Sequence, residues 1–210
     1  MKIYIFADME GISGVSGSEF VTPEGRFYSA GRHYYTTDIN ACARGCFNGG
    51  AEAVIARDGH GSGNHVIWDE LDPRVELFQG RNDTGSLRFP GIENCSGIIL
   101  LGYHAMAGTR GALLEHTYSS RSIQNMWLNG KPVGEIGLDA AVASDYGVPV
   151  LLVTGDDYAC REARDWIPGV RTCQTKRSMG CQGTLLLSQP TAHRNIEEAA
   201  AEAVRHTRDI

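Results

Sequence analysis

Short apolar runs alternate with longer segments of helical periodicity along this chain. The apolar runs stand at Lys2–Asp8, Ala53–Arg57, Val75–Phe78, Ile98–Tyr103 and Val148–Thr154. Apolar residues recur at helical spacing over Arg32–Asn48, a segment that ends at two glycines. Strands that alternate with helices in this way predict an α/β fold, with a mostly parallel sheet flanked by helices.

Later segments extend the alternation. Residues Ile123–Leu128 alternate in polarity and precede Asn129-Gly130, a pair that favours the turn of a hairpin leading to Pro132-Val133. Further helices are predicted over Glu135–Tyr146, from a cap at Asp156 or Asp157 to Trp166, and over Ile196–Arg208.

Composition sets bounds on the core and on the partners. A chain of 210 residues with 42% hydrophobic content can bury a sizeable core. A formal charge of −6 argues against a nucleic-acid partner, which needs a basic face. No apolar stretch approaches the roughly 20 residues of a membrane span. The six cysteines show no CxxC spacing, so we expect free thiols and a cytoplasmic location.

Acidic residues and histidines directly follow three of the predicted strands. Asp8 and Glu10 follow the run at the N-terminus, His60 follows Ala53–Arg57, and His104 follows Ile98–Tyr103. The carboxyl ends of parallel strands share one edge of a sheet, where such sheets bind ligands. An extended backbone points Asp8 and Glu10 to the same side, because they are two positions apart. Carboxylates and imidazoles gathered there suit zinc or another divalent metal.

Each of these residues also has an ordinary structural explanation. Asp8 and Glu10 could end a strand in solvent, and either histidine could be a satisfied structural residue. Their joint occurrence at three strand ends nevertheless favours a metal site. Glycines after the first strand resemble the spacing of a dinucleotide-binding turn, but the two acidic residues would repel a pyrophosphate.

Two further candidates lie beyond the run that ends at Tyr103. His116 belongs to the polar segment TRGALLEHTYSS, where it could be a metal ligand, a general acid or base, or a surface residue. Glu135 opens a predicted helix, and the helix dipole alone accounts for an acidic residue at that position.

Five segments together carry a family resemblance. They are DMEGISG at Asp8–Gly14, DGH at Asp58–His60, GYHAMAG at Gly102–Gly108, EHTY at Glu115–Tyr118 and NGKPVGEIGLDA at Asn129–Ala140. From Met1 to about Lys176, the chain resembles the D-aminopeptidases of dipeptide-transport operons, the M55 metallopeptidases. The resemblance implies a cytoplasmic zinc aminopeptidase that releases N-terminal D-amino acids from short peptides.

The resemblance also implies roles for individual residues. Two zinc ions would be held by Asp8, which bridges them, and by Glu10, His60, His104 and Glu135. The residue assigned as the catalytic nucleophile of the family falls on His116, with a single inserted residue before it. The chemistry of the imidazole leaves open whether it acts as a nucleophile or as a general acid. Family members form a homodecamer of two stacked five-membered rings around a central channel.

Members of the family are longer than this chain. After a helix like the one predicted over Ile196–Arg208, they have a further segment that completes a smaller domain. We therefore expect residues 1–170 to form the metal-binding catalytic domain and residues 171–210 to begin a truncated second domain.

Two rival functions remain. A two-metal phosphoesterase would use similar ligands but needs a cation for the phosphate, for which only Arg57 and Arg110 are candidates. The other rival is a non-catalytic, metal-dependent assembly protein.

Overall fold

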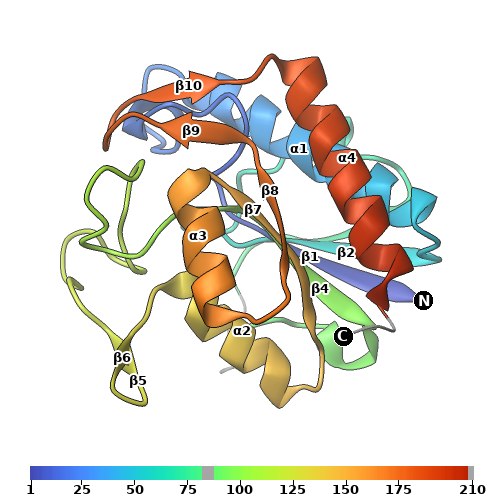
Figure 1. Cartoon of the computed structure of the whole chain (residues 1–210). Coiled ribbons are helices and arrows are strands. Elements are labelled where there is room, and N and C mark those ends of the chain that lie inside the picture. Colours follow the sequence, from blue (N-terminus) through green and yellow to red (C-terminus); the bar gives the residue numbers. More distant parts are fainter. Residues whose placement is uncertain (82–87, 208–210) are drawn as a thin grey trace.

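A computed structural model of the chain describes residues 1–81 and 88–207 (Figure 1). Its main sheet has six strands in the order β3-β2-β1-β4-β7-β8, and every neighbouring pair is parallel. The strands are β1 (Lys2–Ala7), β2 (Ala53–Asp58), β3 (Val75–Phe78), β4 (Gly97–Tyr103), β7 (Val150–Gly155) and β8 (Arg171–Gln174). The predicted α/β fold with a mostly parallel sheet is confirmed.

Helices cover both faces of this sheet. They are α1 (Tyr28–Asn48), α2 (Glu135–Asp145), α3 (Asp157–Trp166) and α4 (Gln189–Arg205). Helices α1 and α4 pack together over one face, and α2 and α3 lie over the other (Figure 1). Alternate side chains of β1 enter the two cores: Ile3 and Ile5 lie under α1, and Tyr4 and Phe6 lie on the side of α2 and α3. Burying each such side chain contributes roughly 1.5–3 kcal/mol to folding.

Shorter elements complete the described part of the chain. Two antiparallel hairpins are formed by β5 (Trp127–Leu128) with β6 (Lys131–Pro132), and by β9 (Lys176–Ser178) with β10 (Thr184–Leu186). Three short 3-10 helices span Ser18–Phe20, Trp68–Glu70 and Ile92–Asn94. The β9–β10 hairpin lies beside the segment that follows β1 (Figure 1), where Ser18 donates a backbone hydrogen bond to the side chain of Gln182. No helix in residues 1–81 or 88–207 is long and apolar enough to cross a membrane.

Three predicted elements have different bounds in the structure. Helix α1 begins at Tyr28 rather than Arg32, because its first turn carries too few apolar residues to register as periodic. The strand expected over Ile123–Leu128 is reduced to β5, since the hairpin is exposed and its alternation reflects no buried face. Helix α4 begins at Gln189, with a proline in the first turn where proline is tolerated, and ends at Arg205. The predicted end at residue 208 lies outside the described residues.

The chain beyond Trp166 contains strands that the sequence pattern did not indicate. Strand β8 joins the main sheet beside β7, and its side chains are mostly polar. Strands β9 and β10 follow before α4 returns to pack on α1. The division into domains at residue 170 stays a prediction.

Candidate metal centre

The candidate site lies at the carboxyl end of β1, between β2 and β4. The strand order reverses between β1 and β4, and an open α/β sheet binds its ligands in the crevice outside such a reversal. Asp8 and Glu10 follow β1, His60 follows β2, and His104 follows β4. These four residues therefore meet at the edge that the sequence predicted.

Glycines allow the strand ends to approach each other closely. Gly102, in β4, has a φ of +73°, and a Cβ there would lie 2.3 Å from the carbonyl oxygen of Asp8. A Cβ on Gly11 would lie 2.0 Å from the carbonyl oxygen of Tyr103. The two positions can hold only glycine without moving the backbone that carries Asp8.

The site residues form two groups of potential ligands. The Asp8 group contains Asp8, Glu10 and His60, and the Glu135 group contains His104, His116 and Glu135. Within each group, one potential ligand atom from every residue lies within 4.8 Å of the others. All six sequence-predicted site residues are thus brought together.

Asp8 connects the two groups through its two carboxylate oxygens. Its Oδ1 lies 3.2 Å from Nδ1 of His60, and its Oδ2 lies 3.4 Å from Nε2 of His104. The side chain of Asp8 is only 9% exposed, so its orientation is fixed by these neighbours and not by solvent. A carboxylate placed in this way can contact two metal ions at once.

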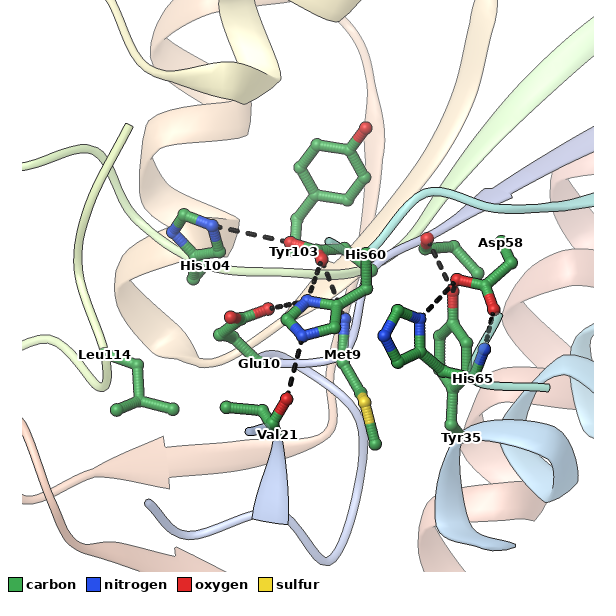
Figure 2. Close-up of polar contacts among 12 residues, drawn as sticks. Met9, Glu10, Val21, Tyr35, Asp58, His60, His65, Tyr103, His104 and Leu114 are labelled. Carbon is green, nitrogen blue, oxygen red and sulfur yellow. Dashed lines mark hydrogen bonds and ion pairs between the residues drawn. The ribbon is translucent and has the colours of Figure 1, made fainter. Parts of the chain in front are cut away.

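His60 faces Glu10 with one ring nitrogen (Figure 2), and the same nitrogen lies near Asp8. Its Nδ1 lies 3.1 Å from Oε2 of Glu10, while its Nε2 lies 3.0 Å from the carbonyl oxygen of Val21. Because a carbonyl only accepts, Nε2 carries the hydrogen of the neutral ring and Nδ1 is the nitrogen that can bind a metal. The ring of His65 packs edge-on against His60 at 4.8 Å.

The Glu135 group is built around two stacked imidazoles. The rings of His104 and His116 lie 4.0 Å apart with an interplanar angle of 11°. Nδ1 of His104 donates to the carbonyl of Ala105 at 2.9 Å, which directs its Nε2 toward Oε1 of Glu135 at 3.4 Å. Nδ1 of His116 donates to the carbonyl of Leu114 at 2.8 Å, and its Nε2 lies 3.9 Å from the same Glu135 oxygen.

The segment around His116 is strained on both sides. Leu114 has a φ of +47° and Tyr118 a φ of +57°, values that residues other than glycine rarely adopt. The amide of Tyr118 donates to Oε1 of Glu135 at 2.7 Å. That hydrogen bond holds the first residue of α2 toward the histidines.

The carboxylates and imidazoles shift one another's protonation. Burial lowers the pKa of His60, but Glu10 and Asp8 raise it further, so that it ends well above its usual value. Burial likewise opposes the charged form of His104, and Glu135 and Asp8 together raise its pKa well above the usual range. Burial raises the pKa of Glu10, yet His60 and His104 hold it below its ordinary value. Protons therefore occupy the site that a cation would compete for.

Two buried atoms in the site have no hydrogen-bond partner. They are Oε2 of Glu10 and Nε2 of His104, and the neighbouring ion-pair contacts of both lack hydrogen-bond geometry. Unpaired buried polar atoms are costly, and they are rare unless a ligand satisfies them. A set of carboxylate oxygens and imidazole nitrogens with unpaired members aimed inward fits zinc.

Arg88 is a residue near the site that the sequence did not indicate. Its guanidinium binds Asp139 through two hydrogen bonds of 2.8 and 2.9 Å, and its NH2 lies 3.9 Å from Oε2 of Glu135. Tyr103 donates to the same Asp139 carboxylate at 2.5 Å. The guanidinium of Arg88 is thus already bound to an aspartate, which argues against a phosphate-binding role for this arginine.

Glu162 is a second unexpected neighbour, from α3. Its Oε2 accepts the amide of Met106 at 2.7 Å, and its Oε1 would lie 2.4 Å from a Cβ on Gly134. It therefore holds the segment after His104, and it leaves no room for a side chain at the residue before Glu135. Burial raises the pKa of Glu162 to about 7, against the opposing effect of the Met106 amide.

Comparison with known proteins now fixes the family. The family model described as D-aminopeptidase, Peptidase_M55, matches residues 1–210. The chain belongs to this family. The D-aminopeptidase of Bacillus subtilis (strain 168) is 36% identical over 206 residues, which cover 98% of this chain and 74% of the relative.

A solved structure gives the same result. The Zn-dependent D-aminopeptidase DppA from Bacillus subtilis, described as a self-compartmentalizing protease, superimposes with a TM-score of 0.93 at 35% identity. The match covers 98% of this chain and 74% of that one. The family resemblance seen in the sequence motifs is confirmed.

Proposed function

We propose that this protein is a zinc-dependent aminopeptidase that releases N-terminal D-amino acids from short peptides at a site for two zinc ions. The ligands would be Asp8, Glu10, His60, His104 and Glu135. One observation carries the proposal: the two oxygens of Asp8 face two separate groups of nitrogen and oxygen donors. Membership of the D-aminopeptidase family and the zinc dependence of the related DppA support it.

The five proposed ligands have distinct tasks. Asp8 would bridge the ions, with Glu10 and His60 completing one position and His104 and Glu135 completing the other. When bound, two zinc ions supply an acidified water and polarise the scissile carbonyl. The carbonyls of Val21 and Ala105 keep His60 and His104 in the tautomers that present a bare nitrogen to the ions.

His116 would transfer the proton. Its side chain is 19% exposed, the most of the six site residues, so a substrate can reach it. The carbonyl of Leu114 holds the hydrogen on Nδ1, which leaves Nε2 free to take up a proton and deliver it to the departing amine. We favour this role over direct attack on the carbonyl, because the activated water makes a covalent intermediate unnecessary.

We further propose that the protein forms a homo-oligomer, a decamer of two five-membered rings. The description of the related DppA as a self-compartmentalizing protease supports an oligomer. The β9–β10 hairpin exposes apolar side chains that an assembly would cover: Met179, Leu185, Leu186 and Leu187.

The bridging role of Asp8 can be tested by elemental analysis. We expect Asp8→Ala to lose both zinc ions, whereas Glu10→Ala should weaken only one of them, since Glu10 belongs to a single group. An Asp8→Ala protein that still holds close to two zinc ions per chain would contradict the bridge.

The reaction class is tested on the zinc-loaded protein. We expect cleavage of dipeptides that begin with a D-residue and no hydrolysis of p-nitrophenyl phosphate. Phosphate-ester hydrolysis in place of peptide cleavage would favour the two-metal phosphoesterase. A zinc-replete protein that is inactive on every dipeptide would favour a non-catalytic role.

A further inference from the structure

Lys176, in β9, is a buried lysine whose ammonium contacts the backbone of the metal centre. Only 1% of the surface of Lys176 is exposed. The Nζ donates to the carbonyl oxygens of Glu10 at 2.6 Å, Ile12 at 2.7 Å and Val15 at 2.8 Å. An ammonium has three donors, so all of them are used by one short loop.

This loop begins at a proposed zinc ligand. Glu10 supplies its carbonyl to Lys176 and its carboxylate to His60, with Oε2 3.1 Å from Nδ1. A rotation of the Glu10 backbone that moved the carboxylate away from His60 would also break the bond to Lys176. On its opposite side the loop is held by Ser13, whose amide and hydroxyl donate to Asp38 at 2.8 and 2.6 Å.

Burying a lysine is unfavourable unless its charge is well compensated. Burial lowers the pKa of Lys176 to about 7, against the opposing effects of Asp156, Asp38 and Glu10. The three short hydrogen bonds to the loop carbonyls stabilise the ammonium form. Lys176 contacts the metal centre through the loop that carries Asp8 and Glu10. The side chains of His104 and Glu135 are held by other residues: the carbonyl of Ala105 accepts from His104, and the amide of Tyr118 donates to Glu135.

We propose that Lys176 is a positioning residue of the metal centre. It fixes the Glu10 backbone and thereby the position from which the Glu10 carboxylate would bind zinc. The inference rests on the proposed two-zinc function. Geometry matters as much as charge: a compact ammonium points donors at three converging carbonyls, whereas the planar fork of arginine cannot.

The test is a zinc titration of the metal-free protein against a chromogenic chelator, which reads metal affinity without any activity assay. In Lys176→Met, we expect one zinc to bind with wild-type affinity and the other to weaken at least ~10-fold, as loss of support around a ligand typically does. Lys176→Arg should fail in the same way although it keeps the charge. Lys131→Met is the control, because Lys131 is exposed, donates to the carbonyl of Asp165 and lies over the ring of Trp166, neither of which is a proposed ligand.

The outcomes separate this inference from the function on which it rests. Unchanged zinc affinity in Lys176→Met, equal weakening of both ions, or full rescue by Lys176→Arg would overturn the positioning role. A wild-type protein that binds one zinc would contradict the two-zinc proposal, and Lys176 would then be judged by whether Lys176→Met weakens that single ion. If circular dichroism shows Lys176→Met to be unfolded, Lys176→Gln, which keeps an amide donor, is titrated instead and should show the same unequal loss.

Discussion

His116 differs from its stacked partner His104 in what surrounds it. His104 is almost fully buried and lies at ion-pair distance from both Asp8 and Glu135. His116 is more exposed, and its nearest carboxylate oxygen is 3.9 Å away. The two rings are alike in type and parallel in space, yet only one combines access to solvent with a nitrogen that no other protein group engages closely. That contrast is the reason for assigning proton transfer to His116.

Replacing His116 with alanine should separate catalysis from metal binding. We expect His116→Ala to keep its full zinc content and to lose at least ~10²-fold in kcat, the lower end of what general acid–base catalysis contributes. Zinc content and kcat are measured on the same preparation. A loss of zinc would indicate that His116 is a metal ligand. An unchanged kcat would show that His116 has no catalytic role.

Glu162 should give the metal-free protein a pH-dependent loss of stability. Its pKa is raised from 4.5 to about 7 by burial, so the folded state holds a proton that the unfolded state releases. The stabilising contribution of that proton is complete below pH 4.5 and is lost as the pH rises to about 7. The loss amounts to at most about 3 kcal/mol.

Glu162→Gln removes this titration and keeps an acceptor for the Met106 amide. We expect the variant to show a shallower fall in unfolding free energy between pH 4.5 and 7, measured by urea denaturation with a chelator present. Glu198→Gln, an exposed substitution on α4, serves as the control and should leave the slope unchanged. An identical slope in Glu162→Gln would mean that the carboxyl is ionised throughout.

At the scale of elements, the ends of β1 and β4 determine where the ligands can lie. The amide of Gly11 donates to the carbonyl of Gly102 at 2.7 Å, and the amide of Gly102 donates to Thr154 at 2.8 Å. The turn after β1 therefore rests directly on β4 and β7. A side chain at Gly102 would push Asp8 out of line with His104.

Two glycine substitutions can separate backbone strain from this close approach. Gly102 and Gly147 have nearly equal φ values of +73° and +71°, but an added Cβ meets nothing within 4 Å at Gly147. Gly147→Ala should cost only the strain of the left-handed region, about 1 kcal/mol. Gly102→Ala should cost roughly 1–3 kcal/mol more and should also lose zinc.

Urea unfolding and elemental analysis of both variants check this expectation. Equal destabilisation of the two, with zinc retained in each, would show that the strand ends can separate without harm to the site.

The sequence predicted the elements that are buried on both faces and missed those that are not. β4 is a continuous apolar run, and such a run by itself predicts a strand that is buried on both faces. In β8 only Cys173 is buried, so the pattern of a core strand is absent. The ligands that follow strands were predictable because parallel strands end at one edge. Lys176 and Arg88 were not, because their partners are main-chain carbonyls and a distant aspartate, which no local pattern records.

At the scale of the whole molecule, the exposed side chains of the β9–β10 hairpin stand out. Leu185, Leu186 and Leu187 are 51%, 46% and 40% exposed, and Met179 in the same hairpin is 62% exposed. Contiguous apolar side chains on a surface mark sites of protein association. The hairpin also reaches the metal centre, since the amide of Leu114 donates to the carbonyl of Cys181 at 3.1 Å. If the hairpin forms the contact between chains, as we propose, the assembly and the site depend on the same element.

Light scattering should detect this assembly. We expect a particle of roughly ten times the chain mass with closed ring symmetry at micromolar concentration. Leu185→Asp should shift the distribution toward smaller species, because a charge would have to be buried in the contact. Its zinc content should stay at the wild-type level, since Leu185 pairs across the hairpin with the exposed Arg177 and not with Lys176. Trp127→Asp, at an exposed apolar residue of the other hairpin, is the control and should assemble like the wild type. A stable monomer in the wild-type protein would contradict the decamer and would remove any channel that could select substrates by size.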